Sequence, residues 1–135
     1  EEGLENAFAR HRRLGEATRR AVKAWGLETL CREPKDASST VTAIMMPAGH
    51  DGDKFRKIVL EAFDVSLGTG LGKVAGRVFR IGHLGDTNDL TVLAAIAGTE
   101  MGLSLAGVPH KVGGVQAAMA YLIEQRSATQ TGRAA

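Results

Sequence analysis

An arginine in the middle of a predicted strand is the residue of this chain that most clearly calls for a chemical partner. Residues 78–84 read as a strand, because they are rich in β-branched and aromatic residues and are bounded by turn residues. Side chains alternate between the faces of a strand, so Phe79 and Ile81 form a core face while Arg80 and Gly82 point the other way. Arginine is almost never fully buried without a partner. We therefore expect an anion beside Arg80, with room left for it by Gly82.

Residue chemistry alone leaves two identities open for this anion. One is an Asp or Glu of the same protein, because structural ion pairs also place charges in such positions. The other is the carboxylate or phosphate of a ligand, which a guanidinium group holds with two parallel hydrogen bonds. His83 is the next ionisable residue of the strand and falls on the same face as Phe79.

A glycine-rich stretch, residues 68–72, precedes this strand and reads Gly-Thr-Gly-Leu-Gly. Its glycines do not have the spacing of dinucleotide-binding or P-loop motifs, and no helix begins directly after them. Without a helix N-terminus the main anion-binding device is missing. We expect a turn-rich loop whose bare backbone lies beside the ligand pocket.

Other kinds of chemical site find no support in the residue spacing. Neither a nucleophile elbow nor a pair of catalytic carboxylates can be picked out, and no metal site is expected. The histidines, which show no ligand spacing with Cys31 or with each other, are His11, His50, His83 and His110.

The string 80–86, Arg-Ile-Gly-His-Leu-Gly-Asp, together with the glycine-rich residues before it, resembles the C-terminal small domain of class V pyridoxal-phosphate aminotransferases. The resemblance is closest to the serine–glyoxylate and alanine–glyoxylate members, and it covers the chain from Glu1 to about Gly107. Further motifs that carry it are residues 1–5 with Arg10 and His11, residues 40–43, and residues 46–49.

The resemblance implies that Arg80 holds the substrate α-carboxylate, with Gly82 and, more weakly, His83 also lining the substrate site. It implies a parent enzyme that uses pyridoxal 5'-phosphate to move an amino group from serine or alanine to glyoxylate, giving glycine. We expect that parent to be a cytoplasmic homodimer whose substrates are an amino acid and a 2-oxo acid.

The cofactor-binding residues of that family belong to a large domain that is missing here. A Schiff-base lysine needs a desolvated pocket. The lysines of this chain all stand in polar or loop surroundings: Lys23, Lys35, Lys54, Lys57, Lys73 and Lys111. We therefore expect no catalytic or cofactor-binding residue in this chain, and no activity from it alone. The alternative is a free-standing small α/β module that binds a carboxylate-bearing ligand or a partner protein without catalysis.

Composition sets the outer limits of these hypotheses. The chain has 135 residues, enough for one domain with its own core, and a formal net charge of +2. Glu5 and Glu16 interrupt the basic face of the first predicted helix and no aromatic residues interleave there, so no nucleic-acid partner is expected. Cys31 is the only cysteine and fits a reducing compartment. The chain opens on charged residues without methionine, which suggests a piece of a longer protein without a signal peptide.

The periodicity predicts an α/β (α+β) fold: a small, mainly antiparallel sheet of about three strands, with helices packed on one face. The small domain is expected over residues 1–126 and a disordered tail over 127–135. Glu100, inside an apolar helix, makes a membrane span a poor interpretation. The predicted helices are 2–25, one starting at Asp51 or Asp53 and ending near Phe63, 90–105 with a cap at Asp86, Thr87 or Asn88, and one ending near Arg126. The predicted strands are 41–46 in a central place, 65–67, 78–84 and an edge strand over 27–32.

Overall fold

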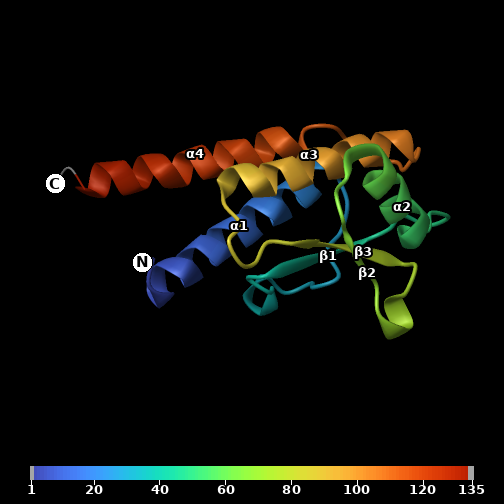
Figure 1. Cartoon of the computed structure of the whole chain (residues 1–135), viewed down its shortest axis with the longest axis horizontal. Coiled ribbons are helices and arrows are strands. Elements are labelled where there is room, and N and C mark those ends of the chain that lie inside the picture. The colour runs from blue at the N-terminus through green and yellow to red at the C-terminus, as the bar shows by residue number, and fades with distance from the viewer. Residues whose placement is uncertain (1, 134–135) are drawn as a thin grey trace.

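The computed structural model of the chain describes residues 2–133, with side chains as far as Ala128. Figure 1 shows the α-helices gathered on one side of a small sheet, which confirms the predicted fold class. The elements in chain order are α1 Leu4–Ala24, η1 Pro34–Asp36, β1 Val41–Met45, α2 Gly52–Phe63, β2 Gly68–Thr69, η2 Gly72–Val74, β3 Val78–Gly82, α3 Asp89–Leu105 and α4 Gly114–Arg133.

The sheet is antiparallel throughout, and its strand order is β1-β3-β2. The central strand is therefore β3, and the central place predicted for residues 41–46 is wrong. The segment 27–32, predicted as an edge strand, adds only an isolated bridge between Thr29 and Ile44 on the outer side of β1. Because residues on both faces of β1 are at least partly covered, its apolar pattern imitates that of a central strand.

The core lies between the sheet and the helices. Phe79 and Ile81 of β3 are fully buried on this side, together with Ile44 of β1. The rings of Phe79 and Phe55 of α2 lie 4.8 Å apart between centroids in a tilted arrangement. The other face of the sheet carries Arg80, so the predicted division of the strand into a core face and an Arg80 face is confirmed.

Two helices begin at side-chain caps that fix the connections around β3. Asp51 accepts the N–H groups of Asp53 and Lys54, so it is the N-cap of α2. Asn88 accepts the N–H of Thr91, and the Thr91 hydroxyl accepts the N–H of Asn88 in return, which gives α3 a capping box. Of the candidate caps that the sequence leaves open, Asp51 is therefore the cap of α2 and Asn88 the cap of α3.

Two boundaries differ from the predicted ones. β2 is formed by Gly68 and Thr69 rather than by residues 65–67, because these two residues pair with Arg80 and Phe79 of β3. α4 continues past Arg126 to Arg133, and no proline interrupts it. Of the segment 127–135, expected to be a disordered tail, residues 127–133 belong to α4. Residues 134–135 lie outside the described part.

Glu100 is held inside the helical layer by three donors. Its carboxylate accepts the indole N–H of Trp25 at 2.8 Å and the backbone N–H groups of Gly113 and Val115 at 2.9 and 3.1 Å. It therefore supplies the anion at the N-terminus of α4. Among residues 2–133, no helix combines the length and the apolar character needed to cross a membrane.

Candidate functional site

Arg80 lies half-buried on the face of the sheet that the α-helices leave uncovered. Its ladder partners are Ala43 on β1 and Gly68 on β2, so small residues flank it on both sides. Arg80 Nε donates to the carbonyl oxygen of Thr69 at 2.8 Å. Of the acidic side chains among the described residues, none forms an ion pair with Arg80. Within residues 2–128, the internal ion pair that the sequence leaves open as one explanation of Arg80 is therefore not formed.

The hydrogen bond to Thr69 determines how Arg80 can receive an anion. Since Nε is already engaged, the two terminal nitrogens remain to donate, and neither is bonded to a described residue. A carboxylate would approach end-on, with one oxygen on each terminal nitrogen, which is one of the two-pronged arrangements a guanidinium offers. Gly82 lies on the same face, and a Cβ at its position would meet only Leu84 Cδ2, at 3.6 Å. The predicted room beside Arg80 is present in this chain.

The glycine-rich residues 68–72 border Arg80 through their backbone. A Cβ on Gly68 would lie 3.0 Å from Arg80 Cβ and 3.1 Å from Arg80 Nε, so the missing side chain leaves space for the arginine itself. A Cβ on Gly70 would overlap the carbonyl oxygen of Val74, which makes the following turn equally intolerant of a side chain. The two missing side chains therefore leave space for the Arg80 stem and for the turn that follows.

Sequence analysis did not identify the residues of α2 that hold β2 in place. Thr69 Oγ1 donates to Asp53 Oδ1 at 2.8 Å, and Arg56 donates to the same oxygen at 3.0 Å. Arg56 also donates to the carbonyl oxygen of Leu67 at 2.7 Å. The only signal in the sequence is the i, i+3 spacing of Asp53 and Arg56, which indicates an ion pair on a helix and not a contact with a strand.

His83 is not brought to Arg80. It is fully buried on the helix-covered side, with Nδ1 3.0 Å from the Ser39 carbonyl oxygen and Nε2 2.9 Å from Thr42 Oγ1. A carbonyl can only accept, so Nδ1 carries the proton and Nε2 accepts the Thr42 hydroxyl. Burial, which disfavours the charged ring, lowers the pKa of His83 to about 4. The residue joins the end of β3 to β1 and the preceding loop.

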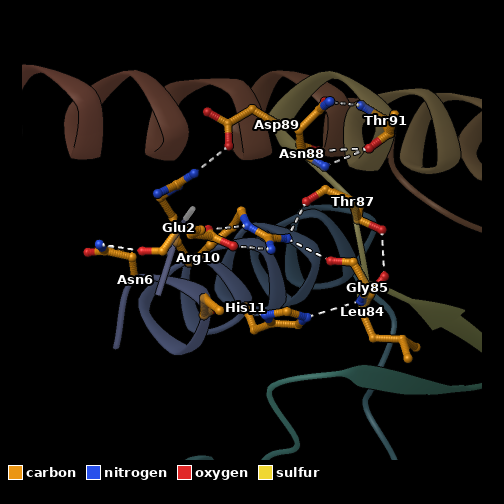
Figure 2. Close-up of polar contacts among 12 residues, drawn as sticks. Glu2, Asn6, Arg10, His11, Leu84, Gly85, Thr87, Asn88, Asp89 and Thr91 are labelled. Carbon is orange, nitrogen blue, oxygen red and sulfur yellow. Dashed lines mark hydrogen bonds and ion pairs between the residues drawn. The ribbon is translucent and has the colours of Figure 1, made fainter. Parts of the chain in front are cut away.

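The first turns of α1 hold the loop that follows β3, as Figure 2 shows. Arg10 donates from Nη1 to the carbonyl oxygens of Gly85 and Thr87 at 2.8 and 2.7 Å, and it forms a two-pronged pair with Glu2. His11 Nε2 accepts the N–H of Gly85 at 3.1 Å. Two of the motifs that carry the family resemblance, Arg10-His11 and the string 80–86, are therefore in direct contact.

Asp89 connects the beginning of α3 with the helices on either side of it. Its two oxygens accept from Arg13 of α1 at 2.8 Å and from Arg126 of α4 at 2.9 Å. Burial alone would raise the pKa of Asp89, but the hydrogen bonds from these two arginines lower it below its ordinary value. The loop between Arg80 and α3 is thus held at both of its ends.

A surface hollow of about 540 Å³ lies elsewhere, between α1 and residues 29–43. Its lining includes Arg19, Lys23 and Arg32 but not Arg80. Glu16 already pairs with Arg19 at 3.1 Å, so part of its positive charge is neutralised from within the protein. The hollow does not include Arg80 but extends to Ala43, its ladder partner on β1.

A pyridoxal-phosphate site does not fit the residues of this chain. The six lysines are all exposed, whereas a Schiff-base lysine stands in a desolvated pocket. Within residues 2–133, no group of three or more His, Cys, Asp or Glu side chains could hold a metal ion. The chemical group at the candidate site is the guanidinium of Arg80.

Comparison with known proteins gives this arrangement a context. No family model matches the chain. It is 54% identical over 125 residues to the serine–glyoxylate aminotransferase of Methylorubrum extorquens, covering 92% of this chain and 31% of that relative. It is 52% identical over 123 residues to the serine–glyoxylate aminotransferase of Arabidopsis thaliana, covering 90% of this chain and 31% of the relative. The chain thus spans about a third of the length of these curated relatives.

The solved structures agree with the sequence matches. The pyridoxamine–pyruvate aminotransferase from Mesorhizobium loti superposes with a TM-score of 0.87 at 32% identity, over 92% of this chain and 32% of that one. The resemblance that the motifs around Arg80 indicate is therefore confirmed. Over about nine tenths of its length the chain is similar to serine–glyoxylate and related aminotransferases, and its fold is that of their C-terminal domain.

Proposed function

We propose that this chain is the small, substrate-carboxylate-binding domain of a longer pyridoxal-phosphate-dependent aminotransferase that transfers an amino group from serine or alanine to glyoxylate. The observation that supports this most directly is the state of Arg80. Its side chain is half-buried and held by Thr69, it has no ion-pair partner among the described residues, and both terminal nitrogens are free to donate. Family membership supplies a ligand that such a group fits, the α-carboxylate of an amino acid or 2-oxo acid.

In this proposal the chain's own contribution is binding and orientation. Arg80 takes the carboxylate end-on, and the open position beside Gly82 leaves space for the rest of a small substrate. Fixing the carboxylate at two points also fixes the direction of the bonds at the neighbouring carbon, which is how positioning lowers a barrier. A larger domain of the parent provides the cofactor site that this chain does not contain. We further propose that the parent is a homodimer and works in the cytoplasm.

The experiment is kinetic analysis of the parent enzyme carrying Arg80→Ala or Arg80→Lys. Removing one partner of a two-pronged arginine–carboxylate pair costs on the order of 2–5 kcal/mol. We therefore expect Arg80→Ala to lower kcat/KM for amino-acid and 2-oxo-acid substrates by roughly 30- to several-thousand-fold, with cofactor binding retained. Arg80→Lys should recover only part of the loss, because an ammonium group lacks the planar fork.

Arg77→Ala is the matched control, because Arg77 is exposed, lies three positions earlier and makes no side-chain hydrogen bond or ion pair with a described residue. It should leave kcat/KM unchanged. A folded Arg80→Ala enzyme with normal kcat/KM would refute the carboxylate assignment. A loss of thermal stability with normal kinetics would assign Arg80 to the structure of the sheet instead.

A further inference from the structure

Strand β2, which supplies the acceptor for Arg80, is too short to be fixed by its own ladder hydrogen bonds. β2 consists of Gly68 and Thr69 only, while strands of globular proteins are usually 3–10 residues long. Yet the Thr69 carbonyl oxygen is the acceptor that fixes Arg80 Nε. If β2 shifts, this oxygen shifts with it, and the direction of the guanidinium changes. Something outside the sheet has to set the position of β2.

Helix α2 supplies that support at both ends of the short strand. Asp53 accepts the hydroxyl of Thr69 at 2.8 Å, next to the carbonyl that holds Arg80. Arg56 donates to the carbonyl of Leu67 at 2.7 Å, just before the strand begins. The two side chains are joined to each other at 3.0 Å. The Asp53–Arg56 ion pair on one turn of α2 therefore contacts the residues on both sides of Gly68.

The position of Asp53 leaves it available for this contact. Asp51 caps α2, so the carboxylate of Asp53 is not needed as the cap and accepts from Thr69 as well as from Arg56. The Thr69 hydroxyl, followed by Arg56, lowers the pKa of Asp53. An ionised carboxylate is a stronger acceptor than the Gly70 carbonyl, which lies 3.2 Å from the same hydroxyl.

We propose that Asp53 and Arg56 are positioning residues for the substrate carboxylate: through Thr69 and Leu67 they hold β2 so that Arg80 presents its two terminal nitrogens end-on. This inference rests on the proposed function of Arg80. It adds two residues of α2 that do not touch substrate and act through the strand between them and the arginine.

The experiment uses the parent enzyme, four single variants of α2 and β2, and Arg80→Ala alone and combined with Asp53→Ala. Asp53→Ala and Thr69→Val remove the contact from either side, and Thr69→Ser restores the hydroxyl without the methyl group. The matched control is Glu61→Gln, which breaks the exposed pair of Lys57 and Glu61, 3.8 Å apart on the same helix, without removing a hydrogen bond to β2. The measurements are kcat and KM for serine, the inhibition constant of glycolate, and the thermal midpoint. Glycolate carries a carboxylate like that of glyoxylate but cannot accept an amino group.

We expect Asp53→Ala and Thr69→Val to raise both the KM for serine and the inhibition constant of glycolate by about 5- to 30-fold, the size of one lost charge-assisted hydrogen bond. Thr69→Ser and Glu61→Gln should stay within about twofold of the unmodified enzyme. In an Arg80→Ala background, Asp53→Ala should have no further effect on either constant, because residues that act through one another are not additive.

Two results would overturn the inference, and they point to different causes. If Arg80→Ala weakens glycolate binding while Asp53→Ala and Thr69→Val only lower the thermal midpoint, α2 stabilises the fold without positioning the arginine. If Arg80→Ala leaves glycolate binding and kcat/KM normal, the carboxylate assignment of Arg80 fails, and the positioning role fails with it.

Discussion

Arg80 occupies the space in which a side chain at position 68 would stand. Gly68 is its ladder partner, and a Cβ there would lie 3.0 Å from Arg80 Cβ and 3.1 Å from Nε. We expect Gly68→Ala to displace the arginine stem and weaken its bond to Thr69, because contacts this close force one side to yield. The KM for serine in the parent should rise about tenfold, a loss of roughly 1.4 kcal/mol. A KM within twofold would show that the arginine can move aside and still bind.

The buried His83 should make the stability of the fold fall as the solution becomes acidic. Its folded pKa of about 4 lies below the ordinary 6.5, so the unfolded chain binds the proton more readily. The stability contribution is complete above pH 6.5 and is lost as pH falls toward 4. Between pH 7 and pH 5 this group should cost about 2 kcal/mol of the free energy of unfolding.

The measurement is urea unfolding at both pH values for the unmodified protein and for His83→Gln, which has no titrating ring. The variant should be less stable at pH 7 and should lose about 2 kcal/mol less on acidification. His50→Gln is a suitable control, because the His50 side chain makes no hydrogen bond with a described residue. Equal pH dependence in His83→Gln and the unmodified protein would contradict the buried, neutral state of His83.

Glu100 should be a main support of the packing between α3 and α4. Glu100→Ala would leave the indole of Trp25 and the N–H groups of Gly113 and Val115 without their acceptor. Unpaired buried donors cost about 1–3 kcal/mol each, so the free energy of unfolding should fall by about 3 kcal/mol or more. Chemical denaturation checks this, with Glu124→Ala on the exposed face of α4 as the control. A loss below 1 kcal/mol would show that water replaces the carboxylate at little cost.

The carboxylate of Glu100 makes a second contribution to the free energy of unfolding that is lost in acid. Burial alone would raise the pKa of Glu100, but the N–H of Gly113 and the indole of Trp25 outweigh it and lower the pKa below 4.5. The stability from the ionised group is therefore present above pH 4.5 and is lost as pH falls through the lower folded value. Glu100→Gln should flatten this part of the stability curve, and an unchanged curve below pH 4.5 would contradict the assignment.

The chain by itself should have no specific pyridoxal-phosphate lysine. All six of its lysines are exposed, so none has the desolvated surroundings that favour a stable imine. Borohydride reduction in the presence of the cofactor, followed by peptide mapping, should give only scattered partial labelling. A single lysine labelled in one-to-one stoichiometry would contradict the absence of a cofactor site.

The two faces of β3 could be predicted from the sequence, because successive side chains of any strand point to opposite faces of the sheet. The contact of Asp53 with Thr69 could not, because it joins a helix to a strand and depends on Asp51 taking the capping position. The sequence predicts that Arg80 needs a hydrogen-bond acceptor. It does not identify the Thr69 carbonyl as the acceptor of Nε, because every residue has a backbone carbonyl. The edge position of β1 was missed because one bridge at Thr29 covers enough of it to permit an apolar pattern.

The contacts of Arg10 and His11 with the loop after β3 have a mechanical consequence. Arg10 holds the carbonyls of Gly85 and Thr87, and His11 holds the N–H of Gly85, so the loop cannot slide along α1 without breaking three hydrogen bonds. β3 is therefore tethered to α1 at its far end and to α2 through β2. The strand that carries Arg80 is thus positioned by contacts with two different helices.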